Sequence, residues 1–291
     1  MNESSRPRQT IESVAALAMQ LGCRHLADYG ANISRHDFTQ RQLMACLILR
    51  AYTKTTYRGV LEILAVSPSL RRELGLKDKL PHYSTLAKFS GRSQVLDIVD
   101  AMIQTIGQAA FRQAGPAPAA AMDATGLETT TASAHFQCRN GGERRKWIKV
   151  SVIVLCGSLL PMSVVMDWGP TNDKCQAQCL IAKARAVAMP DILYADAGYD
   201  AEWVHAQCRE EWGPESVIKP AVHRADGKRN GVWRCGMSKN YLAKMRYGKR
   251  WAVETFFSGL KRTMGSMLTS RRPDQLLKEA AFRVLAYTLR R

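Results

Sequence analysis

Four polar residues share one side of a predicted helix near the C-terminal end of the chain. In YGKRWAVETFFSGLKR, residues 247–262, they fall within an arc of roughly 60° when each residue advances the helix by about 100°; they are Tyr247, Arg250, Glu254 and Lys261. An apolar stripe suited to packing runs beside them. A solvated ion pair between Arg250 and Glu254, four residues apart, is the ordinary interpretation. The helix gains a chemical role if other acids join Glu254.

Asp123 and Asp196 are the acids that can join Glu254. Asp123 lies in AMDATGLE and Asp196 in LYADAGYD, each within or at the end of an apolar segment that predicts a strand. A carboxylate in an apolar strand is costly unless it is paired or binds a metal. Acids at the ends of separate strands can converge on one edge of a sheet, and a helix packed across that sheet brings Glu254 to them.

Three carboxylates with no histidine or cysteine form a donor set of hard oxygen atoms. Such a set favours Mg²⁺ or Mn²⁺. Two such ions can stabilise both the attacking and the leaving oxygen of an in-line phosphoryl transfer. The sequence therefore predicts a site for two metal ions, formed by Asp123, Asp196 and Glu254, that acts on phosphodiesters.

The charge of the chain indicates a polyanionic partner. Its 42 Lys and Arg residues exceed its 25 Asp and Glu residues, which gives a formal net charge of +17 over 291 residues. Nucleic acid is the simplest such partner. A membrane surface fits less well, because no basic amphipathic helix is isolated from the rest of the chain.

Several cations are candidates for DNA contact, and each also has a plain surface interpretation. Lys261 can bind a phosphate, Arg250 can bind a phosphate or orient Glu254, and Tyr247 can stack on a base or bond to a phosphate. A basic stretch between two strands, residues 135–147, is a further candidate. Its candidate contacts are Arg144, Arg145 and Lys146.

Three segments divide the chain. Residues 1–113 predict helices, because apolar residues recur at helical spacing in LMACLILRAY and YRGVLEILAV. AGPAPAA, residues 114–120, predicts a linker. Residues 121–291 predict three strands and then alternating helices and strands, the first strands being joined by hairpins. The fold class is therefore α/β, a mixed sheet flanked by helices and preceded by an all-helical region.

Two short helices between Ser67 and Arg92 can form a helix-turn-helix that directs residues 83–92 towards DNA. Gly75 is expected to end the first helix and Ser84 to cap the second. A plain arm of a helical bundle explains the same pattern equally well.

The eight cysteines are scattered and none forms a CxxC motif. No apolar run approaches 18 residues, and the first residues do not resemble a signal peptide. These features predict a protein of the reducing cytoplasm that does not enter a membrane.

The spacing Tyr247, Arg250, Glu254, Lys261 matches the Y-(2)-R-(3)-E-(6)-K signature of bacterial DDE transposases of the IS4/IS5 superfamily. AMDATGLE and YADAGYD resemble the first and second catalytic segments of that family, and WGPTND resembles the turn before the helix between them. The N-terminal stretch from Tyr57 to Phe89 resembles members of the IS5 group.

The resemblance implies a ribonuclease-H-like catalytic core with Asp123, Asp196 and Glu254 as its metal-binding triad. It implies that Tyr247, Arg250 and Lys261 handle the double-stranded DNA of the transposon ends, which are terminal inverted repeats. Metal-activated water would cut there, and the freed 3′-hydroxyl would attack target DNA. Synapsis of two ends makes a homodimer the expected assembly, in a bacterial cytoplasm and associated with the nucleoid through DNA.

Two other functions use parts of the same pattern. A catalytically inactive or domesticated DNA-binding protein needs the helices and the charge but not the three acids. A structure-specific nuclease needs the three acids but does not join strands, and the Tyr-Arg-Glu-Lys signature favours the transposase over it.

Overall fold

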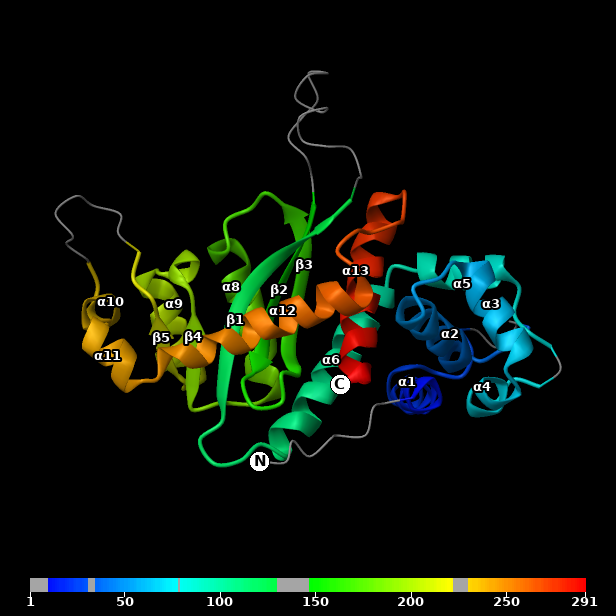
Figure 1. The fold of residues 1–291 in the computed structure, drawn as a ribbon, viewed down its shortest axis with the longest axis horizontal. Coiled ribbons are helices and arrows are strands. Elements are labelled where there is room, and N and C mark those ends of the chain that lie inside the picture. The colour runs from blue at the N-terminus through cyan, green and yellow to red at the C-terminus, as the bar shows by residue number, and fades with distance from the viewer. Residues whose placement is uncertain (1–9, 31–34, 78, 130–146, 222–229) are drawn as a thin grey trace, which may run out of the picture. The chain divides into compact units, whose positions relative to one another are not determined.

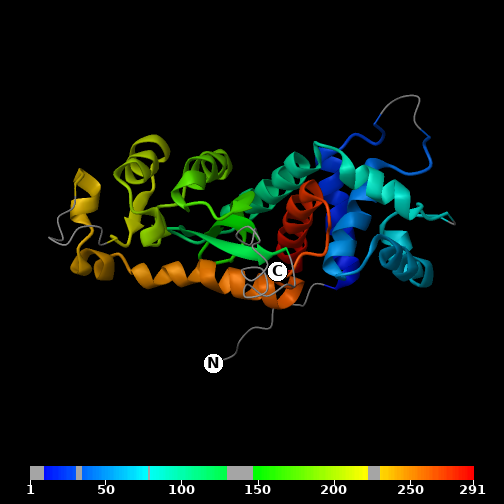
Figure 2. The ribbon, with the colours of Figure 1, turned by 90° about the horizontal axis from the view of Figure 1, so that it is seen from above.

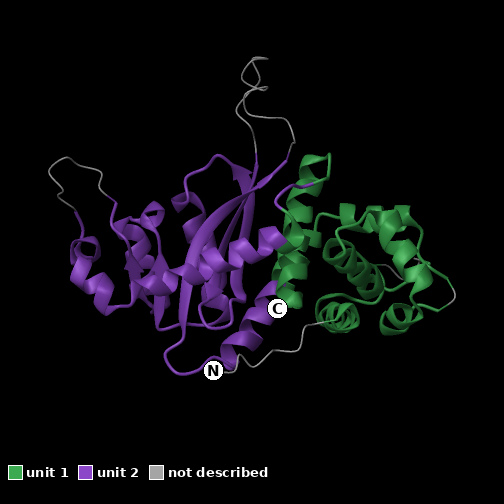
Figure 3. Ribbon diagram, viewed as in Figure 1, with its two compact units in different colours: residues 1–102, 263–265, 269–291 green, residues 103–262, 266–268 purple. Residues whose placement is uncertain are grey.

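The computed structural model describes residues 10–30, 35–77, 79–129, 147–221 and 230–291. Two compact units divide the chain (Figure 3). Their boundaries differ from those expected at 113 and 121, because the C-terminal helix belongs with the N-terminal helices and residues 103–113 belong with the sheet. Unit 1 consists of residues 1–102, 263–265 and 269–291, and unit 2 of residues 103–262 and 266–268.

Unit 1 is helical, as predicted. Threonine side chains accept a backbone N–H at the start of three helices, and these N-caps are Thr10, Thr39 and Thr56. The helices of the unit are α1 (Ile11–His25), α2 (Gln40–Tyr52), α3 (Tyr57–Val66), α4 (Pro68–Glu73), α5 (Tyr83–Gly91), the first part of α6 (Val95–Arg112) and α13 (Pro273–Arg290).

The segment predicted as a helix-turn-helix lacks the tight break that this motif requires. Helix α4 ends at Glu73 and α5 begins at Tyr83, so residues 74–82 separate them. A helix-turn-helix joins its helices by about three or four residues. Gly75 has φ 61° and follows the end of α4, as expected. Ser84 is not the cap of α5, because the His82 ring accepts the Ser84 N–H instead.

Unit 2 contains a five-stranded mixed sheet of order β3-β2-β1-β4-β5. Strands β1, β2 and β3 pair antiparallel, whereas β4 and β5 run parallel to β1. This arrangement confirms the predicted fold class. The strands are β1 (Ala119–Glu128), β2 (Trp147–Leu155), β3 (Pro161–Gly169), β4 (Ile192–Ala195) and β5 (Glu215–Ile218).

Helices cover both faces of this sheet. Figure 1 shows α12 (Trp251–Met264) crossing the strands, and Figure 2 shows α8 (Lys174–Val187) and α9 (Glu202–Ala206) on the opposite side from α12. Met122 of β1 belongs to the apolar core on the α8 side. Since side chains alternate along a strand, Asp123 points to the α12 side. No helix of the described residues is long and apolar enough to cross a membrane.

Phe256 lies on the buried face of α12 and is 0% exposed. Phe256→Ala should lower the free energy of unfolding by about 3–5 kcal/mol, since the loss of an aromatic ring leaves a cavity. Trp251→Ala on the same helix is the matched control, because Trp251 is 68% exposed and should change stability by no more than about 0.5 kcal/mol. Urea denaturation of both variants measures this, and equal losses would contradict the packing described.

Candidate active site

The pairing of β1 with β4 brings Asp123 and Asp196 to neighbouring positions. Met122 of β1 pairs with Ala195, the last residue of the parallel strand β4. The next residue on each chain is an acid, Asp123 on β1 and Asp196 just beyond β4. Each carboxylate accepts a local backbone N–H at 2.8 Å, from Ala124 for Asp123 and from Gly198 for Asp196. The predicted convergence of these two acids is therefore found.

Gly198 leaves room for a third acid. A Cβ added to Gly198 would lie 2.8 Å from Asp173 Oδ2 and 2.9 Å from Asp196 Oδ1, both closer than any side chain tolerates. Asp173 begins α8, so its carboxylate reaches the turn of residues 196–199 from another element. Sequence patterns did not single out Asp173, because an aspartate just before a helix is ordinarily explained as its cap.

The charges of these acids affect one another. The pKa of Asp123 is raised to about 6, mainly by burial. The nearby charges of Asp196 and Asp173 act in the same direction, and the Ala124 N–H and Arg250 oppose them. Burial also raises the pKa of Asp196, again with a contribution from Asp173. Partly buried carboxylates that repel one another are stabilised by a shared cation.

Arg250 connects Glu254 to Asp123. Its Nη1 lies 3.4 Å from Asp123 Oδ2, and its Nη2 donates a short hydrogen bond to Glu254 Oε1. The Arg250 side chain is 15% exposed and that of Glu254 is 43% exposed. Burial lowers the pKa of the Arg250 guanidinium. The hydrogen bond to Glu254 and the charges of the neighbouring acids outweigh this effect, so the pKa is raised.

Among the described residues, no three His, Cys, Asp or Glu side chains lie close enough together to hold a metal ion. The guanidinium of Arg250 lies between Asp123 and Glu254 instead. The chemistry of the donor set still fits Mg²⁺ or Mn²⁺, since the site offers several carboxylate oxygens and two of its acids have raised pKa values. Asp123 and Asp196 are already adjacent, and Glu254 would have to leave Arg250 to join them.

Two tyrosines fix the chain that leads into α12. The Tyr194 hydroxyl donates to the Met245 carbonyl at 2.7 Å, and the Tyr247 hydroxyl donates to the Ala195 carbonyl at 3.0 Å. Their rings meet edge to face with centroids 6.4 Å apart. Burial raises the pKa of Tyr247 to about 12, so its hydroxyl stays a donor. Because Ala195 precedes Asp196, these bonds tie the segment before Glu254 to the strand end that carries the second acid.

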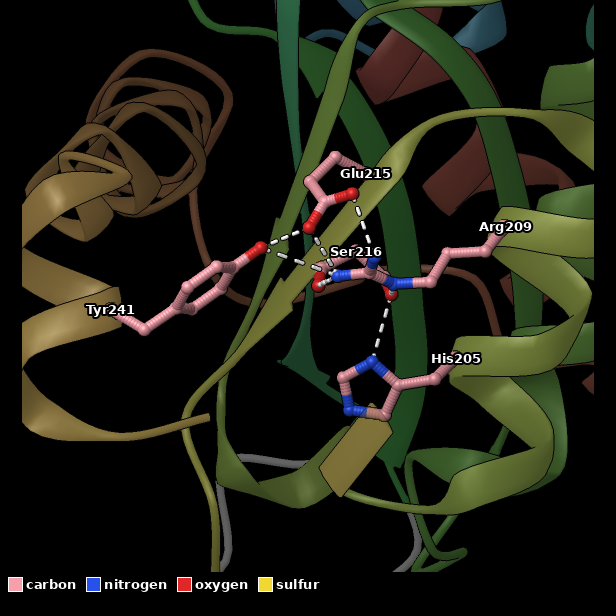
Figure 4. Close-up of polar contacts among 5 residues, drawn as sticks. All are labelled: His205, Arg209, Glu215, Ser216 and Tyr241. Carbon is pink, nitrogen blue, oxygen red and sulfur yellow. Dashed lines mark hydrogen bonds and ion pairs between the residues drawn. The ribbon is translucent and has the colours of Figure 1, made fainter. Parts of the chain in front are cut away.

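A polar network anchors α11 (Lys239–Lys244) to β5 further from the site (Figure 4). Arg209 donates to both oxygens of Glu215, at 2.6 Å and 2.5 Å, and Tyr241 of α11 donates a short hydrogen bond to the same carboxylate. Arg209 also donates to the Ser216 hydroxyl, which shares a second hydrogen bond of 2.8 Å with His205 Nδ1. Burial lowers the pKa of His205 to about 4, which keeps its ring neutral.

Asp200 precedes α9, where an aspartate ordinarily caps the helix, but it does not cap α9. The cap position of α9 is Ala201, with no side-chain hydrogen bond. Asp200 instead accepts two hydrogen bonds of 2.8 Å from Arg234 and one of 2.9 Å from the Ala221 N–H. Its pKa is lowered, because these donors outweigh the effect of burial.

The remaining predicted residues lie away from the acids or outside the described residues. Lys261 is on α12, seven residues beyond Glu254, and is half-buried. Arg144, Arg145 and Lys146 lie outside the described residues.

Comparison with known families identifies the class of this protein. The family model of the transposase DDE domain matches residues 114–289, so the chain belongs to this family. A comparison with curated protein sequences gave no match. Among solved structures, the chain is similar to a piggyBac transposase, in a cryo-EM structure of its synaptic complex with hairpin DNA. The identity is 9% and the TM-score 0.46, with 97% of this chain and 72% of that chain covered.

The raised pKa of Asp123 predicts a pH-dependent stability in metal-free buffer. Its folded-state pKa of about 6 lies above the ordinary 3.8, so the stabilising contribution is present at low pH and is lost as pH rises through about 6. Asp123→Asn cannot ionise. Its free energy of unfolding should therefore rise relative to the unmodified chain between pH 4 and 7, by up to about 3 kcal/mol. Denaturant titrations in EDTA measure this difference, and a difference that is constant with pH would contradict the environment described.

Proposed function

We propose that this protein is the transposase of an insertion sequence, of the IS4/IS5 superfamily and its IS5 group. It binds the terminal inverted repeats of its element and carries out metal-dependent cleavage and strand transfer on DNA. One observation carries the proposal: Asp123 within β1 and Asp196 just beyond β4 occupy neighbouring positions, and Arg250 joins Glu254 to Asp123. The membership of the chain in the transposase DDE family gives this arrangement its chemical context.

Asp123, Asp196 and Glu254 are the residues that would hold Mg²⁺ or Mn²⁺, as two ions. When bound, such ions make water nucleophilic and neutralise the charge that develops on a phosphodiester in the transition state. The fold of the chain determines where these three carboxylates lie. The strand pairing fixes the two aspartates, and the buried face of α12 fixes Glu254. Arg250 keeps the glutamate near β1 and can exchange it for a DNA phosphate.

The segment that contains Glu254 has the charge of a DNA-contacting surface. Residues 231–262 contain eight Lys and Arg residues and one acid, Glu254. Its exposed cations include Lys239, Lys244, Arg246, Lys249 and Arg262. Phosphate neutralisation by such cations provides affinity that does not depend on base sequence.

The same DNA would contact the other residues predicted from the sequence. We assign Tyr247, Arg250 and Lys261 to the transposon end near the acids, and Arg144, Arg145 and Lys146 to DNA beside β1 and β2. The helical unit would provide further DNA binding. Two ends have to be held together for strand transfer, so the active assembly would be a homodimer on DNA in the bacterial cytoplasm.

A second candidate is a DNA-binding protein derived from a transposase that no longer cuts. One observation favours it: the Glu254 carboxylate is bound to Arg250, which would have to release it before it could join a metal site. The two functions share DNA binding and differ in catalysis.

Cleavage and joining of DNA test the proposal directly. The unmodified chain should cut a duplex that carries the ends of its element and join it to target DNA when Mg²⁺ or Mn²⁺ is present. Glu254→Gln should bind the same DNA but lower the rate by at least about 10³-fold, since a metal ion contributes several kcal/mol to such a transition state. Gel analysis of cut and joined products measures this. End binding without any cutting by the unmodified chain would support the non-catalytic candidate.

The salt dependence of DNA binding tests whether the cations of residues 231–262 contact DNA phosphates. Removing one phosphate contact by Lys249→Ala should weaken binding to all sequences and reduce the slope of log K against log salt by about 1. Arg185→Ala is the matched control, because it removes the same charge from an exposed position of α8, on the opposite face of the sheet. Equal changes in the two variants would show that only the net charge matters, not this surface.

A further inference from the structure

Asp173 stands where helix α8 begins, yet it does not cap the helix. It occupies the cap position with φ −60° and ψ −36°, and its side chain makes no cap hydrogen bond. The neighbouring Asn172 serves instead, because its Oδ1 accepts the Lys174 N–H at 3.1 Å. An aspartate at this position ordinarily accepts a backbone N–H of the first turn. Its carboxylate is therefore committed to other contacts.

One oxygen of Asp173 holds a buried lysine. The Lys149 ammonium lies 2.5 Å from Asp173 Oδ1 and donates to the Thr171 carbonyl at 2.7 Å. Lys149 is a β2 residue that is 5% exposed. A buried ion pair costs desolvation free energy and is weak support for stability by itself. The pair does hold Asp173 in one position, beside the strand that pairs with the Asp123 strand.

The other oxygen of Asp173 faces the second acid of the site. Asp173 Oδ2 lies where a Cβ at Gly198 would come within 2.8 Å of it, and Asp196 Oδ1 lies 2.9 Å from the same point. The Gly198 N–H is the donor that orients Asp196. The negative charge of Asp173 is felt at both Asp123 and Asp196, where it raises the pKa. The carboxylates of Asp173 and Asp196 thus occupy the space beside Gly198 that a side chain would fill.

We propose that Asp173 is a positioning residue of the catalytic centre. Lys149 orients it against Gly198, where its carboxylate fixes the turn that carries Asp196 and adds the negative charge that draws a divalent cation to Asp123 and Asp196. This inference rests on the proposed function, because it assigns Asp173 a part in the same metal site.

Mn²⁺ binding to the full-length protein without DNA tests this role. Asp173→Asn should raise the Kd for Mn²⁺ about 10- to 100-fold, the usual effect of removing a group that supports metal ligands. Asp167→Asn is the matched control, because Asp167 pairs with Lys149 across β2 and β3 and accepts hydrogen bonds from Gln176 and the Trp168 N–H. It should change the Kd less than about threefold. Calorimetric titration gives these constants.

The Mn²⁺ dependence of DNA cleavage gives a second readout. Asp173→Asn should need about 10- to 100-fold more Mn²⁺ for half-maximal rate but approach the unmodified rate at saturation. Lys149→Gln tests the effect of charge alone. It removes the positive charge beside Asp173 but keeps a side-chain N–H donor at this position. It should bind Mn²⁺ at least as tightly as the unmodified chain, and it decides the matter if Asp173→Asn does not fold, as judged by circular dichroism. An equal loss of Mn²⁺ affinity in Lys149→Gln and Asp173→Asn would show that Lys149 and Asp173 form only a structural ion pair, and it would overturn the proposal.

The outcomes also separate this inference from the proposed function. If the unmodified chain does not bind Mn²⁺, or if Asp196→Asn binds it equally well, the metal site of the proposed function fails. If Asp196→Asn loses binding and Asp173→Asn behaves like the Asp167 control, only the role of Asp173 fails.

Discussion

The candidate site depends on the repulsion between two carboxylates at neighbouring positions, Asp123 within β1 and Asp196 just beyond β4. The parallel pairing of β1 and β4 leaves no freedom in this respect, since Met122 opposite Ala195 makes Asp123 and Asp196 neighbours. Both acids are partly buried, so water screens their charges poorly. Arg250 offsets the repulsion at Asp123 in the metal-free protein, and Asp173 adds to it at Asp196. Such an arrangement favours a cation of higher charge density than a guanidinium.

Several hydrogen bonds hold the segment before α12 against β4 and β5, next to the two aspartates. The hydroxyls of Tyr194 and Tyr247 bond to backbone carbonyls across the junction, and the network of Tyr241 with Glu215 fixes the preceding helix to β5. These are partly buried contacts between polar groups, and displacing one partner would lower the stability of the fold. A helix whose entrance is fixed in this way delivers Arg250 and Glu254 to the same place each time the protein folds.

The sequence predicted the fold class because its signals are local. Alternating and continuous apolar runs identify strands, helical spacing identifies helices, and the order of these elements indicates an α/β sheet. Acids in apolar strands stand out for the same reason, so Asp123 and Asp196 were found, although Asp123 lies within β1 and the parallel register of β1 and β4 brings it beside Asp196. The ion pair from Arg250 to Glu254 was also visible, since four residues separate its members.

Contacts between distant segments could not be predicted in this way. The bond from Arg250 to Asp123 joins residues 127 apart, and the bond from Arg234 to Asp200 joins residues 34 apart. Asp173 and Asp200 both precede helices, where an aspartate ordinarily acts as a cap, but each forms an ion pair with a residue distant in sequence, Lys149 and Arg234 respectively. The grouping of α13 with the N-terminal helices likewise depends on packing between the two ends of the chain.

The most direct test of the account is a crystal structure of the full-length protein with Mn²⁺ and DNA, with anomalous scattering used to locate the metal. We expect Mn²⁺ to be bound directly by carboxylate oxygens of Asp123, Asp196 and Glu254, and Arg250 to have moved from Glu254 to a DNA phosphate. Mn²⁺ that binds elsewhere would contradict the proposed metal site, as would a site that stays empty at saturating Mn²⁺ while Arg250 keeps both of its carboxylate partners.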